Sequence, residues 1–127
     1  GLGGAASTTT YFTVTGEVLI CYLVPTVVST LTQSGATPTV ALGVVNSTSL
    51  FIAATTATAL VTGEFWTEAT GGGTANAGIA VPAALKDIVV TSNIGVLVGG
   101  TNNVNGGTLR IDVWWRPLSS GSSLVPA

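Results

Sequence analysis

Residues 11–24 read YFTVTGEVLICYLV, and this stretch carries the clearest alternation in the chain. Side chains two residues apart in a strand point to the same face, so the pattern predicts an extended strand. The opposite face is polar up to Glu17 and apolar beyond it, and a strand with two apolar faces is covered on both sides. We expect the domain's own second sheet to cover one face and a neighbouring subunit the other. The shared apolar face is expected to comprise Phe12, Val14, Val18, Ile20, Tyr22 and Val24.

Short runs of the same kind recur along the rest of the chain. They are rich in Thr, Val, Ile and aromatic residues and are separated by Gly, Asn, Ser and Pro, which is the pattern of strands joined by turns. Residues 81–87, VPAALKD, suit a single helical turn beginning at Pro82, and a strand entry suits them as well. About seven to nine short strands without long helices predict an all-β fold, either an antiparallel β-sandwich or a jelly-roll-like domain.

The first ten residues, GLGGAASTTT, have no apolar period. Such a segment is typical of an extended N-terminal arm, and we expect residues 1–10 to reach a neighbour. Residues 11–127 are expected to form a single β-sandwich domain, since a chain of 127 residues lies within the usual size of one domain.

The chain contains very little charge. Asp, Glu, Lys and Arg make up 6% of it, compared with about 25% in an average soluble domain, while its apolar share is ordinary. A net charge of -2 gives little repulsion between molecules in solution. We infer that other subunits cover much of the surface in a stable assembly.

The ionisable residues exclude several kinds of partner and site. Three basic residues are too few for the phosphate contacts of nucleic-acid binding or for an anionic membrane surface. Without histidine and with one cysteine, the chain cannot assemble a His-based or Cys-based metal site. Cys21 lies in an apolar run and is expected to be a buried, unreactive thiol. We expect no cofactor, no metal, no nucleic acid and no membrane partner.

Catalysis is not expected either. General acid and base chemistry would fall to carboxylates and one lysine. Glu64 and Glu68 are a conceivable glycosidase pair, but no motif around them holds two carboxylates at a set distance. The glycine-rich loop that follows has no lysine and no helix after it, so it does not suit phosphate binding. We therefore expect that the chain is not an enzyme.

The segment RIDVWWRPLSSG, residues 110–121, holds two of the three tryptophans and two of the three basic residues. In a strand, Trp115 lies on one face with the apolar residues that precede it, which predicts a core stripe that ends at Pro117. The opposite face is expected to hold an ion pair between Arg110 and Asp112. We expect this outward face to contact a partner, and a protein before a sugar. The candidate contact residues are Arg110, Asp112, Trp114 and Arg116.

The tryptophans also raise the alternative of a sugar-binding platform. Trp66, Trp114 and Trp115 could each offer an aromatic face, yet tryptophans in small β domains more often anchor cores or interfaces. We expect Arg116 to stack on the indole of Trp114. The residues expected in the core or at a subunit interface are Val18, Leu19, Ile20, Cys21, Tyr22, Leu23 and Trp115.

Two short motifs stand near the two ends of the chain. They are GxVLI, with Gly16, Val18, Leu19 and Ile20, and aromatic-x-Pro-Leu-x-x-Gly, with Trp115, Pro117, Leu118 and Gly121. With these motifs in this order, the chain resembles a loose family of small tailed-bacteriophage virion structural proteins. That family usually has Tyr where Trp115 stands, a difference that retains an aromatic side chain.

The resemblance implies a virion structural protein at the capsid surface and supplies no catalytic residue. It implies first a capsid decoration (cement) protein that stabilises the head, self-associates as a homotrimer and contacts the major capsid protein. One alternative is a receptor-binding or tail-fibre domain that recognises host surface glycans. A further alternative is a tail-tube or baseplate subunit.

Overall fold

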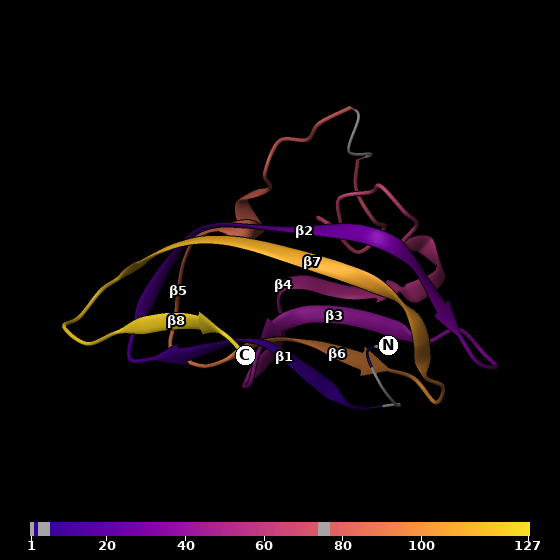
Figure 1. Cartoon of the computed structure of the whole chain (residues 1–127), viewed down its shortest axis with the longest axis horizontal. Coiled ribbons are helices and arrows are strands. Elements are labelled where there is room, and N and C mark those ends of the chain that lie inside the picture. Colours follow the sequence, from indigo (N-terminus) through magenta and orange to yellow (C-terminus); the bar gives the residue numbers. More distant parts are fainter. Residues whose placement is uncertain (1, 3–5, 74–76) are drawn as a thin grey trace.

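Two antiparallel β-sheets pack face to face in this chain (Figure 1). The structure is a computed structural model that describes residues 2, 6–73 and 77–127. The larger sheet has the strand order β4-β3-β6-β1-β8, and the smaller sheet has the order β5-β2-β7. This arrangement confirms the all-β sandwich expected from the alternating runs. The strands are β1 (Thr8–Thr15), β2 (Val18–Gln33), β3 (Thr39–Val44), β4 (Ser47–Thr56), β5 (Lys86–Val90), β6 (Ile94–Gly99), β7 (Val104–Pro117) and β8 (Ser123–Pro126).

The two longest strands, β2 and β7, pair with each other along most of their length and lie above β3 and β6 in Figure 1. Three strand pairs nest in chain order, as in a jelly roll: β1 with β8, β2 with β7, and β3 with β6. The nesting stops there, because β4 pairs with β3 and β5 pairs with β2. The fold is therefore an antiparallel sandwich with jelly-roll-like outer pairs.

The hydrophobic core lies between the two sheets. Val18 and Ile20 of β2 face it from the smaller sheet, and Val40 and Leu42 of β3 face it from the larger one, all fully buried. Each pair is two residues apart, so the alternation of the strands places both side chains on the same inner face. Burial of such side chains is the main source of stability, at about 1.5–3 kcal/mol for each.

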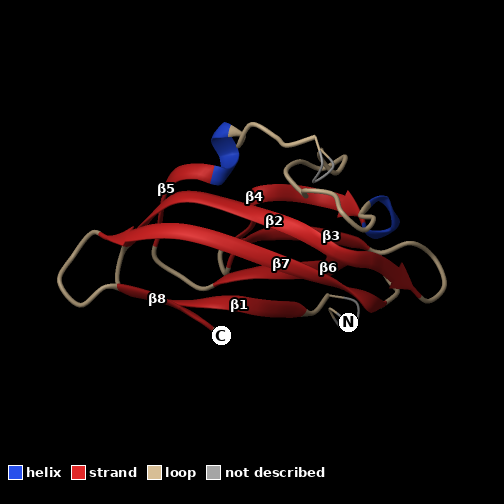
Figure 2. Ribbon diagram, turned by 45° about the horizontal axis from the view of Figure 1, so that its top comes forward, coloured by secondary structure: helices blue, strands red, loops and turns tan. Residues whose placement is uncertain are grey.

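The connection from β4 to β5 carries one tryptophan into this core. It contains two single turns of 3-10 helix, η1 (Ala57–Ala59) and η2 (Ala83–Leu85), drawn in blue in Figure 2. Between them, Trp66 is fully buried, and its indole N–H donates a hydrogen bond to the Thr55 hydroxyl over 3.0 Å. Its backbone amide donates to a carbonyl of β2 over 3.0 Å, beyond the end of β5. Both readings left open for residues 81–87 are present in part, since a helical turn forms η2 and β5 begins directly after it at Lys86.

A β-bulge at Cys21 decides which residues of β2 face the core. Ile20 and Tyr22 pair with two adjacent residues of β7, so Cys21 is an extra residue in β2. Beyond the bulge, Leu23 is fully buried while Tyr22 is 42% exposed. The expectation that Tyr22 and Val24 share the core face of Ile20 is therefore wrong, because one inserted residue exchanges the two faces of a strand.

The extended arm expected for residues 1–10 is not confirmed. The three threonines at its end belong to β1 and pair with β6, and Leu2 is buried against the core. The Leu2 carbonyl also accepts a hydrogen bond from the Thr9 hydroxyl over 3.2 Å. Residues 1 and 3–5 lie outside the described residues. The described part of this segment thus packs on its own sandwich, and the expected boundary after residue 10 falls inside β1.

Candidate functional site

The outer face of the smaller sheet carries aromatic, aliphatic and charged side chains. Antiparallel pairing places residues of β5, β2 and β7 in rows across this sheet. The β-bulge at Cys21 separates the two rows, so that Leu19 and Tyr22 both lie on the outer side of β2. We call this surface the aromatic face. It comprises the row Val89, Leu19 and Arg116, the row Lys86, Tyr22 and Trp114, and the flanking residues Val24, Asp112 and Arg110.

Two exposed rings stack at the centre of the aromatic face. Tyr22 and Trp114 lie on neighbouring strands with ring centroids 6.1 Å apart and an interplanar angle of 13°. Trp114 is 59% exposed, so the pair presents a broad apolar surface to solvent. The bulge at Cys21 produces this pair, because regular alternation through Cys21 would direct Tyr22 into the core.

All three basic residues of the chain belong to this face. The Arg110 Nε atom lies 3.1 Å from the Asp112 Oδ2 atom, so the ion pair expected from their spacing is present. Both side chains are more than half exposed, and a pair of this kind contributes about 0–1 kcal/mol to stability. Since Asp112 offsets one of the three cations, the face has a positive balance in a chain whose net charge is -2.

The structure separates the three tryptophans that were considered as sugar platforms. Trp66 is fully buried and cannot contact a ligand, and Trp115 is half-buried against the core. Trp114 alone among them is exposed. The ring stacked on its indole belongs to Tyr22, whereas the sequence led us to expect the guanidinium of Arg116 there. Tyr22 was expected in the core or at a subunit interface and not with the outward residues of β7, because the bulge that turns it outward has no signature in the alternation.

Cys21 is less buried than expected. Its thiol is free and the residue is half-buried at the bulge, rather than enclosed in the core. The correction has the same cause as that for Tyr22, since the bulged residue belongs fully to neither face of the strand.

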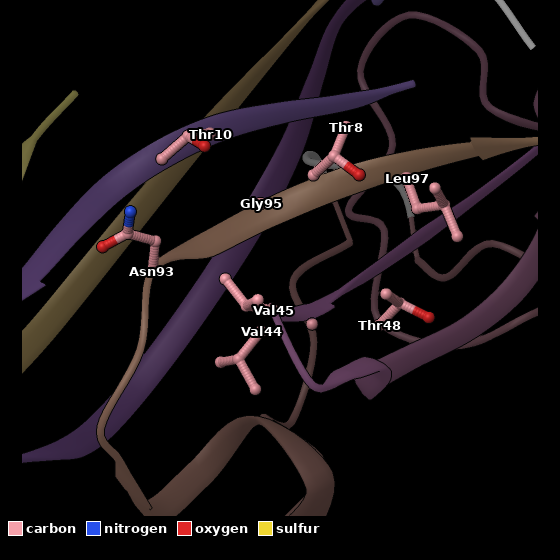
Figure 3. A pocket seen from close by; sticks show the side chains of 9 residues that line it. Thr8, Thr10, Val44, Val45, Thr48, Asn93, Gly95 and Leu97 are labelled. Carbon is pink, nitrogen blue, oxygen red and sulfur yellow. The ribbon is translucent and has the colours of Figure 1, made fainter. Parts of the chain in front are cut away.

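A pocket of about 230 Å³ lies on the outer side of the larger sheet (Figure 3). Hydroxyl groups, apolar side chains and the amide of Asn93 line it, and its lining contains no ionisable side chain. The Asn93 Oδ1 atom already accepts a hydrogen bond from the Val14 amide over 3.0 Å. The pocket therefore suits a small neutral group and offers no acid or base. Its lining residues are Thr8, Thr10, Gly43, Val44, Val45, Thr48, Asn93, Gly95 and Leu97.

Few other groups of potentially catalytic or metal-binding side chains occur in the part of the chain that the structure describes. Glu64 and Glu68 lie in the connection after η1, where Glu68 accepts a hydrogen bond from the Thr70 hydroxyl over 3.3 Å. Within the described residues, no three His, Cys, Asp or Glu side chains are grouped as metal ligands. The same residues include no helix long and apolar enough to cross a membrane. The aromatic face is accordingly the strongest candidate for a functional surface.

Comparison with known proteins adds no family to this description. No family model, no curated protein and no solved structure matches the chain.

Proposed function

We propose that this chain is a structural protein of a bacteriophage virion, a capsid decoration (cement) protein that binds the head surface as a homo-oligomer and stabilises it. The observation that carries the proposal is the aromatic face, where Tyr22 and Trp114 are stacked yet exposed. Exposed aromatic side chains flanked by arginine are the usual anchors of protein interfaces. The resemblance carried by the sequence motifs near the two ends of the chain implies the class of partner, the major capsid protein.

The composition supports the same proposal. A surface rich in hydroxyls and nearly free of charge is suited to permanent cover by other proteins, because charge repulsion would oppose close packing of many copies. A cement protein adds buried area across joints between capsomers. Repeated weak contacts from a symmetric oligomer then combine into tight binding through effective concentration.

Co-sedimentation of the purified chain with expanded heads tests the proposal. Trp114→Ala removes the largest exposed side chain of the aromatic face, and we expect it to weaken head binding by at least tenfold, since interface tryptophans typically contribute about 2 kcal/mol or more. Val45→Ala is the matched control, because Val45 is 64% exposed but lies at the pocket of the larger sheet. Loss of binding in the Val45 variant alone, or no binding by the unmodified chain, would contradict the proposal.

A second function is favoured by the geometry of the two rings. Exposed and nearly parallel aromatic rings offer the flat apolar platform on which sugar rings stack, as in a receptor-binding or tail-fibre domain that recognises host glycans. Under this alternative, fluorescently labelled protein stains host cells and loses staining with Trp114→Ala. A cement protein leaves the cells unstained and binds heads.

A further inference from the structure

Strand β7 forms one edge of the smaller sheet. It pairs with β2 on one side, and the described part of the chain places no strand on its other side. An edge of this kind presents unpaired backbone N–H and C=O groups and is a template for another strand. The other edge strands are shorter. Strand β4 has 10 residues and its pairing with β3 shifts in register, β5 has 5 residues, and β8 has 4 and ends in Pro126, which cannot donate a ladder hydrogen bond. Strand β7 has 14 residues, and its regular part runs from Thr108 to Pro117, because Gly107 has a φ of +97° and the pairing with β2 shifts there. This part is the longest regular docking edge of the described sandwich.

A second copy of the chain is the occupant to which the charge pattern points. When two identical strands pair antiparallel about a two-fold axis perpendicular to the sheet, paired residues lie on the same face. One residue of the strand must then lie opposite its own copy, with the axis between the two. We call this residue the centre, and β7 offers a small number of possible centres. Each centre sets a different pairing of the charges along β7.

The charges select among these centres. An axis at Ile111 places Arg110 opposite Asp112 of the second copy, and the symmetry makes this contact twice. An axis at Arg110 or at Asp112 opposes like charges directly. An axis at Val113 opposes Arg110 and Arg116, which are also like charges. Opposite charges directly across a strand pair are stabilising and like charges are destabilising.

One other centre, Trp114, also brings unlike charges together by pairing Asp112 with Arg116. Its aligned residues are 111–117, and those of the axis at Ile111 are 108–114, since the regular part of the strand begins at Thr108. The alignment at Trp114 ends on Pro117, which has no N–H to donate, so the centre at Ile111 is favoured.

The paired segment of this register avoids the irregular part of β7. Gly107 has a φ of +97°, so the chain leaves the extended conformation just before Thr108, the first residue of the paired segment. In the dimer, Arg110 and Asp112 each pair with the second copy in place of each other. The loss of the ion pair within one chain costs little, because both side chains are exposed.

We propose that two copies of this chain pair antiparallel through β7 about a two-fold axis at Ile111, which joins their smaller sheets into one continuous sheet. The aromatic faces of both copies then lie on the same side of that sheet. This contact goes beyond the proposed function and does not depend on it, because it concerns the isolated protein. It joins copies in pairs, so a trimer would require a different contact.

Charge-swap variants in sedimentation equilibrium test the pairing without any phage particle. Arg110→Asp and Asp112→Arg each place like charges opposite each other at both contacts, and we expect each to weaken dimerisation about tenfold to thirtyfold. A mixture of these two variants restores opposite charges at both contacts and should form a heterodimer of wild-type affinity. The double variant should form a homodimer again.

Arg116→Asp is the matched control, since it makes the same charge change on the same face but lies beyond the paired residues 108–114 of this register. It should leave the dimer intact. The proposal would be overturned by a wild-type chain that stays monomeric up to high micromolar concentration, or by a trimer as its smallest oligomer. Single variants without effect, a mixture that fails to pair, or an Arg116 variant that behaves like the Arg110 variant would also overturn it. Recovery in the mixture shows at the same time that both single variants are folded.

Discussion

Trp66, Trp114 and Trp115 share one side-chain chemistry but occupy three environments. Trp66 is fully buried with its N–H bonded to Thr55, Trp115 is half-buried at the edge strand, and Trp114 is exposed in a stack with Tyr22. The opposite orientations of Trp114 and Trp115 follow from their adjacency in a strand, so the sequence predicts them. The burial of Trp66 depends on the path of the connection after β4, and no local pattern indicates that path.

The same substitution at two of these tryptophans should therefore have very different effects on stability. Trp66→Ala empties a closed site and leaves the Thr55 hydroxyl without its donor, and we expect it to lower the free energy of unfolding by about 3–5 kcal/mol. Trp114→Ala removes an exposed side chain and one ring stack, so its cost should stay below about 1.5 kcal/mol. Urea unfolding followed by far-ultraviolet circular dichroism measures both. Equal costs for the two variants would refute the separation into a core and a contact tryptophan.

The ionisation of Tyr11 is expected to make the stability of the fold depend on pH in the alkaline range. Burial raises the pKa of its hydroxyl above the ordinary value of 10.0, because the interior disfavours the phenolate. Its contribution to stability is complete below the pKa of the unfolded chain, and it is lost as pH rises through the higher pKa of the folded chain, since the unfolded chain releases its proton first. We expect the free energy of unfolding to fall above about pH 10, and Tyr11→Phe to remove part of that fall. Identical pH profiles for the two proteins would show that Tyr11 does not supply the dependence.

At the scale of elements, the β-bulge in β2 connects the core to the outer surface. One extra residue keeps Ile20 and Leu23 inside and turns Tyr22 outward beside Trp114. The alternation predicts one strand through residues 11–24, whereas the structure divides this stretch into β1 and β2 in different sheets. It does not identify the bulge either, because a run with two apolar faces reads equally well in either register. This is why the core face of β2 was predicted correctly before Cys21 and incorrectly after it.

Deleting Cys21 tests the bulge directly. The deletion places Tyr22 directly after Ile20, so regular alternation keeps Ile20 and Leu23 inside and Tyr22 outside opposite Trp114. We therefore expect the variant to fold, to keep the ring stack, and to lose much less than the ~3–5 kcal/mol that removal of a large core side chain costs. Cys21→Ser, which retains the bulge, is the control, and thermal unfolding of both variants measures the difference. A deletion that costs as much as the loss of a large core side chain would contradict the assignment of Cys21 as the extra residue.

At the scale of the whole molecule, the sequence predicts the class of the fold better than its assembly. Strand content, the sandwich and the ion pair on β7 follow from period, turn residues and spacing. The division of strands between two sheets depends on contacts far apart in the chain, and so does the inclusion of Thr8–Thr10 in β1. Threonine repeats suit an arm and a strand equally, so the composition of the first ten residues could not separate these two structures.

The two sheets of the molecule are unequal, and this asymmetry underlies the account of its function. The larger sheet presents threonine, glycine and a small neutral pocket, while the smaller sheet presents stacked rings and every cation of the chain. In the proposed function, low net charge would let many copies pack closely, and the one aromatic face of each copy would let all of them bind in the same orientation.

Electron cryo-microscopy of the phage particle that we propose carries this chain tests the central claim most directly. The account predicts density for the sandwich at symmetry-related positions on the head, with the smaller sheet toward the capsid and Tyr22 and Trp114 buried in the contact. Density for the chain in the tail tube, the baseplate or a fibre would contradict it. So would a head-bound copy whose aromatic face points into solvent.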